Sequence, residues 1–482
     1  MRLSKSQFIR GLQCMKSLWL LKNKPELRTL PDEAQQKIFD TGKDVGILAQ
    51  QLYPGGTEIV FDYKKINKNI KITQGLIENG IKTIYEATFL YDDVLVIVDI
   101  LHLGDNGWEL YEVKSSTSFK PVNENDISIQ YYVLEGSGIK LDKVSLVHIN
   151  NKYCRKGNLD VGELFKKVDL TETAISNQEF AATEIDRMKN KAAKGQPEPS
   201  IGIGLHCYDP YECDFKNYCW KHIPEKSVFT LTGMRKKKKF ELYNNGIISF
   251  PDIPNGCSLT NAQQIQIQAE LQGSDFIDLD EIKQFLENLI EPIGFLDFET
   301  FQQAVPDFDN QHPYEQVPFQ YSLHILKNSK LKHYEFLGEP GKDPRGKFIS
   351  QLLNDTSNLE SIVVYNMGFE KRILNSLAKI FPEYKSEITN ITSRILELMI
   401  PFRSKAYYMA SMEGSYSIKK VLPALVPELS YDGMDIGDGM AAMRSYGALG
   451  NMTDNKKIEN IKNALLEYCC MDTLAMVKIL EK

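Results

Sequence analysis

Acidic residues in three distant segments of the chain have the spacing of metal ligands. Asp297 and Glu299 lie two apart in the apolar run FLDFET, so a strand there would put both side chains on one face. Glu370 follows a second apolar segment, and Tyr468 and Asp472 lie one helical turn apart. Carboxylates drawn from separate segments suit two hard divalent cations, Mg²⁺ or Mn²⁺, which clamp the attacking and leaving oxygens of a phosphodiester.

A second acidic group lies on a predicted β-hairpin. Residues 94–101 and 108–116 are apolar and β-branched, and the turn signal GDNG separates them. A turn on DN would put Asp99 opposite Glu112, whereas a turn on NG would put it opposite Lys114. In either register two carboxylates and a lysine share one face within reach of a metal ion.

Three cysteines occur at two equal gaps in the segment HCYDPYECDFKNYCW, namely Cys207, Cys213 and Cys219. The N-terminus lacks a signal peptide, so we expect a cytoplasmic protein in which clustered thiols bind metal rather than form disulfides. Four thiolates suit either an iron–sulfur cluster or zinc. Zinc sites more often show cysteine pairs at closer spacing than these.

The hairpin acids resemble the core of the PD-(D/E)xK nucleases, which place one acid on a strand and E-x-K on the next. Gln130, one helical turn after Asp126, is similar to the glutamine-bearing helix of RecB-like and Cas4-like members. The resemblance implies metal ligation by Asp99 and Glu112, and catalytic roles for Lys114 and Gln130. Those members often carry a histidine where this chain has Gly46, so a ligand or basic group there is either missing or supplied elsewhere.

Some RecB-like and Cas4-like nucleases hold a 4Fe–4S cluster with one cysteine before the nuclease core and three after it. By this resemblance Cys14, in CMKSLWL, is the fourth ligand beside Cys207, Cys213 and Cys219. The cluster would fasten the first helix to the far end of the domain. Zinc is the alternative metal.

The C-terminal set resembles the DEDD family of DnaQ-like 3′–5′ exonucleases, on an RNase H-like fold. The order of elements agrees: D-x-E, then N-x-x-F-acid, then Y-x(3)-D. The resemblance implies that Asp297, Glu299, Glu370 and Asp472 hold Mg²⁺ or Mn²⁺ and that Tyr468 orients the attacking water. Glu370 departs from the pattern, because aspartate is more usual there.

Over nearly its full length the chain also resembles uncharacterised bacterial proteins with a DUF2779 C-terminal domain. YEVKSS, IQYYVLEGSG, FLDFETF, GSYSIKKVLPAL and YCCMDT carry this resemblance. It implies an α/β chain with two nuclease domains: a PD-(D/E)xK domain over 1–224, a mostly helical connector over 225–290, and an RNase H-like domain over 291–482. Residues 1–28 are expected to form one helix, and residues 32–52 a helix or a pair broken near Gly42.

The formal net charge of −7 argues against a surface coated with basic residues, although local basic patches are sufficient for nucleic acid. Two such patches lie in residues 1–28 and in the run RKKKK at 235–239. The expected partner is DNA, single-stranded or at ends. The alternatives are an RNA exonuclease and a binding adaptor with degenerate sites. The lack of an eighteen-residue apolar run predicts no membrane span.

Overall fold

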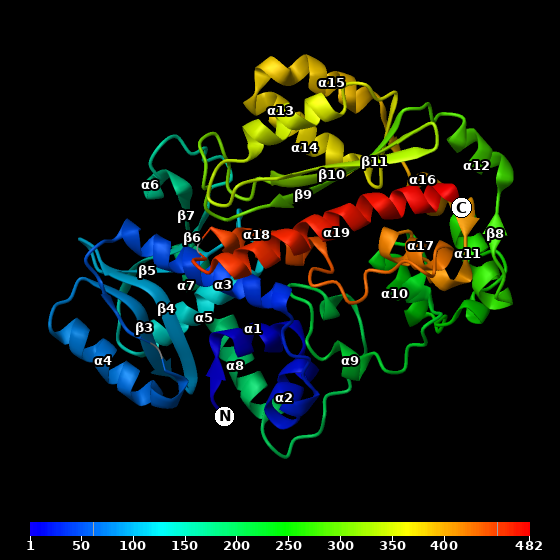
Figure 1. The fold of residues 1–482 in the computed structure, drawn as a ribbon. Coiled ribbons are helices and arrows are strands. Elements are labelled where there is room, and N and C mark those ends of the chain that lie inside the picture. Colours follow the sequence, from blue (N-terminus) through cyan, green and yellow to red (C-terminus); the bar gives the residue numbers. More distant parts are fainter. Residues whose placement is uncertain (61, 451) are drawn as a thin grey trace. The chain divides into compact units, whose positions relative to one another are not determined.

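The computed structural model describes residues 1–60, 62–450 and 452–482, and the chain divides into two compact α/β units (Figure 1). The N-terminal unit contains residues 1–222 together with 303–314, and the C-terminal unit contains residues 223–302 and 315–482. The first boundary lies close to the predicted one at 224. Residues 225–290 cluster with the C-terminal unit.

The N-terminal unit is built on a seven-stranded mixed sheet of order β2-β3-β4-β5-β6-β7, with β1 paired to β4. The strands are β1 (Leu3–Ser4), β2 (Thr57–Glu58), β3 (Thr83–Tyr91), β4 (Val94–Leu103), β5 (Trp108–Lys114), β6 (Leu141–Ile149) and β7 (Phe165–Asp169). Helices α1 (Lys5–Gln13), α2 (Met15–Asn23), α5 (Val122–Gly136) and α8 (Gln178–Ala192) pack in the core on one face. Helix α3 (Glu33–Ala49) packs on the other face.

The predicted hairpin is formed by β4 and β5. The Gly104 amide donates to the Gly107 carbonyl at 2.9 Å, so DN is the two-residue turn. The ladder ends with Ile100 opposite Tyr111, and the same register places Asp99 opposite Glu112. The first of the two predicted registers is therefore confirmed.

The predicted single helix over residues 1–28 is wrong, because Cys14 separates α1 from α2. Cys14 is extended, with φ −162° and ψ 112°, so it caps the end of α1, where its amide donates to the Arg10 carbonyl, and the start of α2, where its carbonyl accepts from the Leu18 amide. Residues 33–49 form one continuous helix through Gly42, as one of the two alternatives predicted. A single glycine lowers helix stability without ending the helix.

The C-terminal unit is built on a five-stranded sheet of order β11-β10-β9-β12-β13, in which β10 runs antiparallel to the other four strands. The strands are β9 (Ile293–Phe301), β10 (Val317–Lys327), β11 (Lys330–Leu337), β12 (Ser361–Val364) and β13 (Ile395–Glu397). Helix α19 (Asn455–Glu481) runs along one face, and α13 (Arg345–Asp355), α14 (Met367–Ile380) and α15 (Lys385–Ser393) lie on the other (Figure 1).

The alternation of side chains along β9 decides which residues face α19. Phe295 packs in the same core as Met476 of α19, whereas Leu296 and Phe298 pack in the core formed with α13 and α14. Since side chains alternate between the faces of a strand, Asp297 and Glu299 share the face of Phe295.

The remaining helices of four or more residues span four to 13 residues each. They are α4 (Ile66–Glu78), α6 (Val161–Leu164), α7 (Thr171–Ser176), α9 (Lys216–Cys219), α10 (Lys236–Asn244), α11 (Asn261–Gln272), α12 (Leu279–Leu286), α16 (Ile400–Ser404), α17 (Ile418–Leu425) and α18 (Gly439–Leu449). A two-stranded sheet pairs β8 (Phe276–Ile277) with β14 (Tyr407–Tyr408). Across the described residues, no helix combines the length and apolar character needed to cross a lipid bilayer.

Candidate active sites

Three carboxylates meet between β9 and α19 in the C-terminal unit. Asp297, Glu299 and Asp472 each offer an oxygen, and these oxygens lie within 4.8 Å of one another. Glu299 and Asp472 are buried and Asp297 is half-buried. The spacing of two puts Asp297 and Glu299 on one face of β9, and the packing of α19 against that face brings Asp472 to them.

Burial and mutual repulsion favour the protonated forms of these carboxyl groups. Burial and the charges of Asp472 and Glu299 raise the pKa of Asp297 well above its usual range. Burial and Asp472 raise the pKa of Glu299 to about 8, and burial raises the pKa of Asp472 to about 6. Carboxylates this close are costly unless protons or a cation neutralise them, so the donor set fits a divalent metal ion.

Glu370, the fourth predicted ligand, lies near this group without joining it. Its charge contributes to the raised pKa of Asp297, but its oxygens are not part of the group within 4.8 Å. Glu370 is only 2% exposed, and its Oε2 atom has no hydrogen-bond partner among the described residues. Burial raises the pKa of Glu370 to about 8. A buried carboxylate oxygen without a partner is a further indication of a cation site.

Tyr468 is buried beside the acidic group, and its hydroxyl is among the groups that lower the pKa of Asp472. Two residues that the spacing did not predict complete the surroundings. The Tyr431 hydroxyl donates to Asp472 Oδ1 at 2.7 Å. The Lys419 ammonium lies 5.7 Å from the ring centre of Tyr431 and 5.9 Å from that of Tyr468, and its charge offsets part of the rise in the pKa of Glu299.

The first turn of α18 lies beside the acidic group. A Cβ atom at Gly439 would be in van der Waals contact with Glu299 Oε2, at 3.4 Å. Asp438 caps this helix by accepting from the Ala441 amide at 2.7 Å, and its charge contributes to the raised pKa of Glu299.

The raised carboxyl pKa values predict that the metal-free chain loses stability as the pH rises. Glu299 and Glu370 bind protons more tightly when folded than unfolded, where glutamate titrates near pH 4. The contribution of these two protons to the free energy of unfolding is therefore complete below about pH 4, and it is lost as the pH rises through about 8. Each unit of raised pKa corresponds to about 1.4 kcal/mol.

We expect the melting temperature in EDTA to fall between pH 6 and pH 9. Added Mn²⁺ should restore more stability at pH 9 than at pH 6, because at pH 9 the metal ion no longer competes with protons for the carboxylate oxygens. Differential scanning fluorimetry across this range checks both slopes. A melting temperature that is independent of pH in EDTA and insensitive to Mn²⁺ would contradict the prediction.

In the N-terminal unit, Glu112 lies at the centre of a network of lysines. Lys5 Nζ and Lys114 Nζ each lie 2.6 Å from Glu112 Oε1, and Gln130 Nε2 donates to Oε2 at 2.8 Å. Lys114 also pairs with Asp126 Oδ2 at 2.5 Å. Burial opposes the charge of Glu112, but the two lysines outweigh it and hold its pKa below the usual range.

Asp99 lies beside this network at an irregular step of the sheet. Its Oδ2 accepts from the Val113 amide at 2.6 Å, and burial and Glu112 raise its pKa to about 8. Glu86 of β3 falls opposite Asp99 in the register and has φ +57°, a strained conformation for glutamate. Burial raises the pKa of Glu86 to about 6, and Lys5 and Glu112 are among the charges acting on it.

Lys5 and Glu86 are therefore residues of this site that the hairpin spacing did not reveal. Lys5 was visible only as one of several basic residues in the first segment, and Glu86 only as a lone acid in the apolar run TIYEATFLY. Lys5 brings a basic group to Glu112 from another element. A Cβ at Gly46 would meet nothing within 4 Å, so the backbone there leaves open space.

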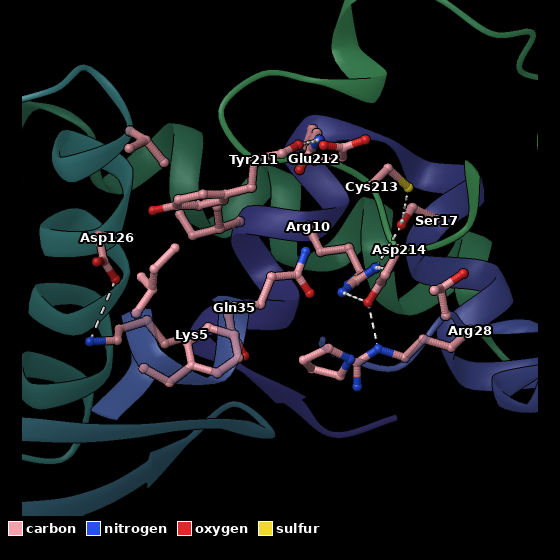
Figure 2. A pocket seen from close by; sticks show the side chains of 18 of the residues that line it. Lys5, Arg10, Ser17, Arg28, Gln35, Asp126, Tyr211, Glu212, Cys213 and Asp214 are labelled. Carbon is pink, nitrogen blue, oxygen red and sulfur yellow. Dashed lines mark hydrogen bonds and ion pairs between the residues drawn. The ribbon is translucent and has the colours of Figure 1, made fainter. Parts of the chain in front are cut away.

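A pocket of about 560 Å³ extends from this network along α1 (Figure 2). Figure 2 shows Lys5 and Asp126 at one end and Arg10, Arg28 and Asp214 at the other. Its lining also includes the exposed side chains of Ile38 and Phe39. The pocket thus combines charged and apolar groups along one path.

The four cysteines line one smaller pocket, together with Lys16 and Phe215. Cys14 comes from the break between α1 and α2, and the other three come from the segment after α8. Burial raises the pKa of Cys219 to about 11, and the thiols of Cys213, Cys14 and Cys207 add to this rise. The structure thus places Cys14 beside the trio, whereas the metal remains a prediction.

The cysteine segment is also tied to the first helices by ion pairs. Asp214 accepts from Arg10 at 2.5 and 2.9 Å and from Arg28 at 2.5 Å. Gln13 donates to the carbonyls of His206 and Tyr211 at 2.7 and 2.6 Å. These contacts hold the cysteine segment against the first helices, and the four cysteines that line the pocket are a donor set for a thiolate-bound metal or cluster.

Replacing Cys14 with serine is expected to remove the metal from this pocket. The melting temperature should fall by about 5–10 °C, because several kcal/mol of metal binding also stabilise the fold. Metal analysis and calorimetry of the full chain check this, with Cys154→Ser as the matched control. A brown chain that loses iron identifies the cluster, and a colourless chain that loses zinc identifies the alternative. Unchanged metal content in Cys14→Ser would contradict both.

The basic run at 235–239 is only partly available to a ligand. Arg235 and the next three lysines are exposed. Lys239 instead donates to the carbonyl of Phe229 at 2.6 Å, and burial lowers its pKa.

Comparison with known proteins finds one family match, to a segment that lies mostly in the C-terminal unit. Residues 294–417 match the model of a family described as a domain of unknown function, DUF2779. This segment contains Asp297, Glu299 and Glu370 and ends before Tyr468 and Asp472.

Curated relatives are similar over a limited length. The chain is 27% identical over 219 residues to the uncharacterized protein MG366 homolog of Mycoplasma pneumoniae, covering 41% of this chain and 33% of the relative. It is 25% identical over 208 residues to the uncharacterized protein UU173 of Ureaplasma parvum, covering 38% and 30%. The chain thus spans about a third of the length of these relatives. No solved structure matches.

Proposed function

We propose that this chain is a metal-dependent DNA nuclease with two phosphodiesterase sites, acting on single-stranded DNA or DNA ends. The observation that carries the proposal is the meeting of Asp297, Glu299 and Asp472 within 4.8 Å, beside the buried and unpartnered oxygen of Glu370. Carboxylates brought together at such electrostatic cost are what a phosphodiesterase needs to hold divalent metal ions.

The architecture around these carboxylates supports a DEDD-type exonuclease on an RNase H-like fold. A mixed five-stranded sheet, with β10 antiparallel to the other four strands and helices on both faces, supports this part of the proposal. Asp297 and Glu299 lie on its central strand, and Asp472 comes from the last helix. This agrees with the order of motifs read from the sequence.

Each residue near the C-terminal site has a role that follows from its position. Asp297, Glu299 and Asp472 would hold Mg²⁺ or Mn²⁺, with Glu370 as an outer carboxylate. When bound, the ions would supply a nucleophilic water and neutralise charge on the phosphate. Tyr468, near Asp472, would orient the attacking water. Lys419 contributes positive charge close to the carboxylates.

The N-terminal network supports a PD-(D/E)xK site. Asp99 and Glu112 would hold the metal, with Glu86 nearby. Gln130 donates to Glu112 Oε2, and this hydrogen bond fixes the direction of Glu112 Oε1. Lys114 and Lys5 would then turn from Glu112 toward the phosphate, where two positive charges stabilise the developing negative charge.

The pocket along α1 would hold the nucleic-acid strand near Lys5 and Lys114. Since aromatic side chains stack on bases whatever the sequence, Phe39 is the expected stacking residue. Phe39 is 58% exposed and lines this pocket.

Replacing Phe39 with alanine should weaken single-stranded DNA binding about tenfold, because one stacked base contributes about 1–3 kcal/mol. Fluorescence anisotropy with a labelled oligonucleotide in EDTA measures binding without cleavage. Phe180→Ala, an exposed phenylalanine on α8, is the matched control. Equal affinities for the two variants and the unaltered chain would exclude Phe39 from the binding path.

The proposal is tested by incubating the full chain with single-stranded DNA, duplex DNA and RNA in Mg²⁺ and Mn²⁺. We expect metal-dependent cleavage of DNA that EDTA abolishes. Cleavage of RNA alone would assign the chain to RNA processing. Salt-sensitive binding without any cleavage would identify an adaptor and contradict the nuclease.

A further inference from the structure

A second group of metal-ligating side chains lies in the C-terminal unit. His324 of β10, His333 of β11 and Cys470 of α19 each offer one ligand atom, and these atoms lie within 4.8 Å of one another. The two histidines are directly paired in the antiparallel ladder, and their ring centres lie 4.5 Å apart. The nuclease chemistry proposed above uses none of the three.

One hydrogen-bond arrangement around these histidines leaves a lone pair free on each ring. Thr473 Oγ1 lies 2.7 Å from Ser322 Oγ and 2.8 Å from His324 Nδ1, and it is 3.1 Å from the Cys470 carbonyl. Ser322 Oγ lies 2.9 Å from His333 Nε2. With Thr473 donating to the Cys470 carbonyl and Ser322 donating to Thr473, His324 Nδ1 and His333 Nε2 are the donors to these hydroxyl oxygens, and the lone pairs of His324 Nε2 and His333 Nδ1 are available to a metal ion.

The surroundings of the two rings suit a metal ion. Metal-binding histidines characteristically donate their other N–H to a neighbouring oxygen, and each ring here has a hydroxyl oxygen within 2.9 Å of one of its nitrogens. Glu335 adds a carboxylate, whose Oε2 lies 4.0 Å from His333 Nδ1.

We propose that His324, His333 and Cys470 bind a zinc ion, with Glu335 at the fourth position. Two imidazoles, a thiolate and a carboxylate form a tetrahedral zinc set and a poor set for Mg²⁺ or Ca²⁺. Ligand atoms around zinc are separated by about 3.5 Å, so small side-chain rotations from the observed arrangement are sufficient. Binding replaces the thiol proton of Cys470, which leaves to solvent, with a bond from sulfur to zinc.

The ion would join α19 to two neighbouring strands of the sheet. Cys470 lies between Tyr468 and Asp472 on α19, so the same turn of helix carries zinc and catalytic groups. Zinc would therefore hold α19 against β10 and β11, beside the carboxylates of β9. Its role would be structural, since three or four protein ligands leave little room for substrate.

Zinc content of the full chain, measured by mass spectrometry after loading with zinc and desalting, tests the proposal. We expect His333→Ala and Cys470→Ser each to lose one equivalent relative to the unaltered chain. Lys332→Ala, an exposed neighbour on β11, should retain it. Zinc held by the four-cysteine pocket is common to all chains and cancels in the comparison. Equal zinc content in all four chains would overturn the proposal.

A second measurement does not depend on the folding of the Cys470 variant. Alkylation of Cys470 in the unaltered chain, followed by peptide mass analysis, should slow about tenfold or more on adding zinc. The His333→Ala chain should show little protection, since it lacks one ligand. Alkylation at the same rate with and without zinc in the unaltered chain would equally overturn the proposal. Neither readout depends on nuclease activity.

Discussion

Replacing Asp297 with asparagine is expected to slow 3′-end trimming by about 10³-fold. Asp297 lies at the centre of the carboxylate group, and metal ions held there supply several kcal/mol of transition-state stabilisation, at about 1.4 kcal/mol for each tenfold in rate. The assay is the shortening of a 5′-labelled single strand with a free 3′ end, in Mg²⁺ or Mn²⁺. Asp280→Asn makes the same chemical change on an exposed carboxylate of α12 and should trim normally.

The Asp297→Asn chain should be more stable than the unaltered chain in EDTA at pH 8. Burial, Asp472 and Glu299 raise the pKa of Asp297, so removing its charge relieves repulsion in the metal-free fold. Loss of trimming together with a higher melting temperature separates loss of catalysis from unfolding. Normal trimming by the Asp297→Asn chain would contradict a catalytic role for the group of carboxylates.

Replacing Glu112 with glutamine is expected to slow cleavage at the N-terminal site by about 10²–10³-fold, because a metal ligand and the partner of two lysines lose their charge. The substrate is a single strand blocked at its 3′ end, which the C-terminal site cannot trim. An Asp297→Asn background removes residual trimming. Normal cleavage of this strand by Glu112→Gln would exclude Glu112 as a catalytic group.

The stability of Glu112→Gln should change in the opposite direction to that of Asp297→Asn. Lys5 and Lys114 each lie 2.6 Å from Glu112 Oε1, so the variant leaves two half-buried ammonium groups with Asp126 as their ion-pair partner among the described residues and Asp99 farther away. We expect a loss of about 2–4 kcal/mol, measured by chemical denaturation. Adding Lys5→Met to Glu112→Gln should restore part of this stability and none of the activity. Equal stability of the three chains would contradict the ion-pair network.

The sequence alone was sufficient for the local geometry of both sites. Glu112 and Lys114 share a face of a strand, as do Asp297 and Glu299, because side chains alternate along any strand. Tyr468 and Asp472 share a face of a helix because four residues are close to one turn. A two-residue turn within GDNG allowed two registers for the β4–β5 hairpin, both of which kept Asp99 near Glu112 or Lys114.

Tertiary structure decided which further residues reach those groups. Lys5 meets Glu112 because α1 crosses the sheet face that carries it, a contact 107 residues apart in sequence. Tyr431 reaches Asp472 from a segment with no regular spacing, and Glu370 remains outside the carboxylate group. Periodicity is a local property, whereas these contacts depend on how distant elements pack.

The break at Cys14 and the pairing of His324 with His333 also depend on tertiary structure and not on a local sequence pattern. The residues around Cys14 read as one helix, and only the folded chain turns its thiol toward three cysteines nearly two hundred residues later. His324 and His333 are unremarkable in sequence. They meet because β10 and β11 pair in one register and α19 crosses them, and a shift of one residue would have turned one ring to the other face of the sheet.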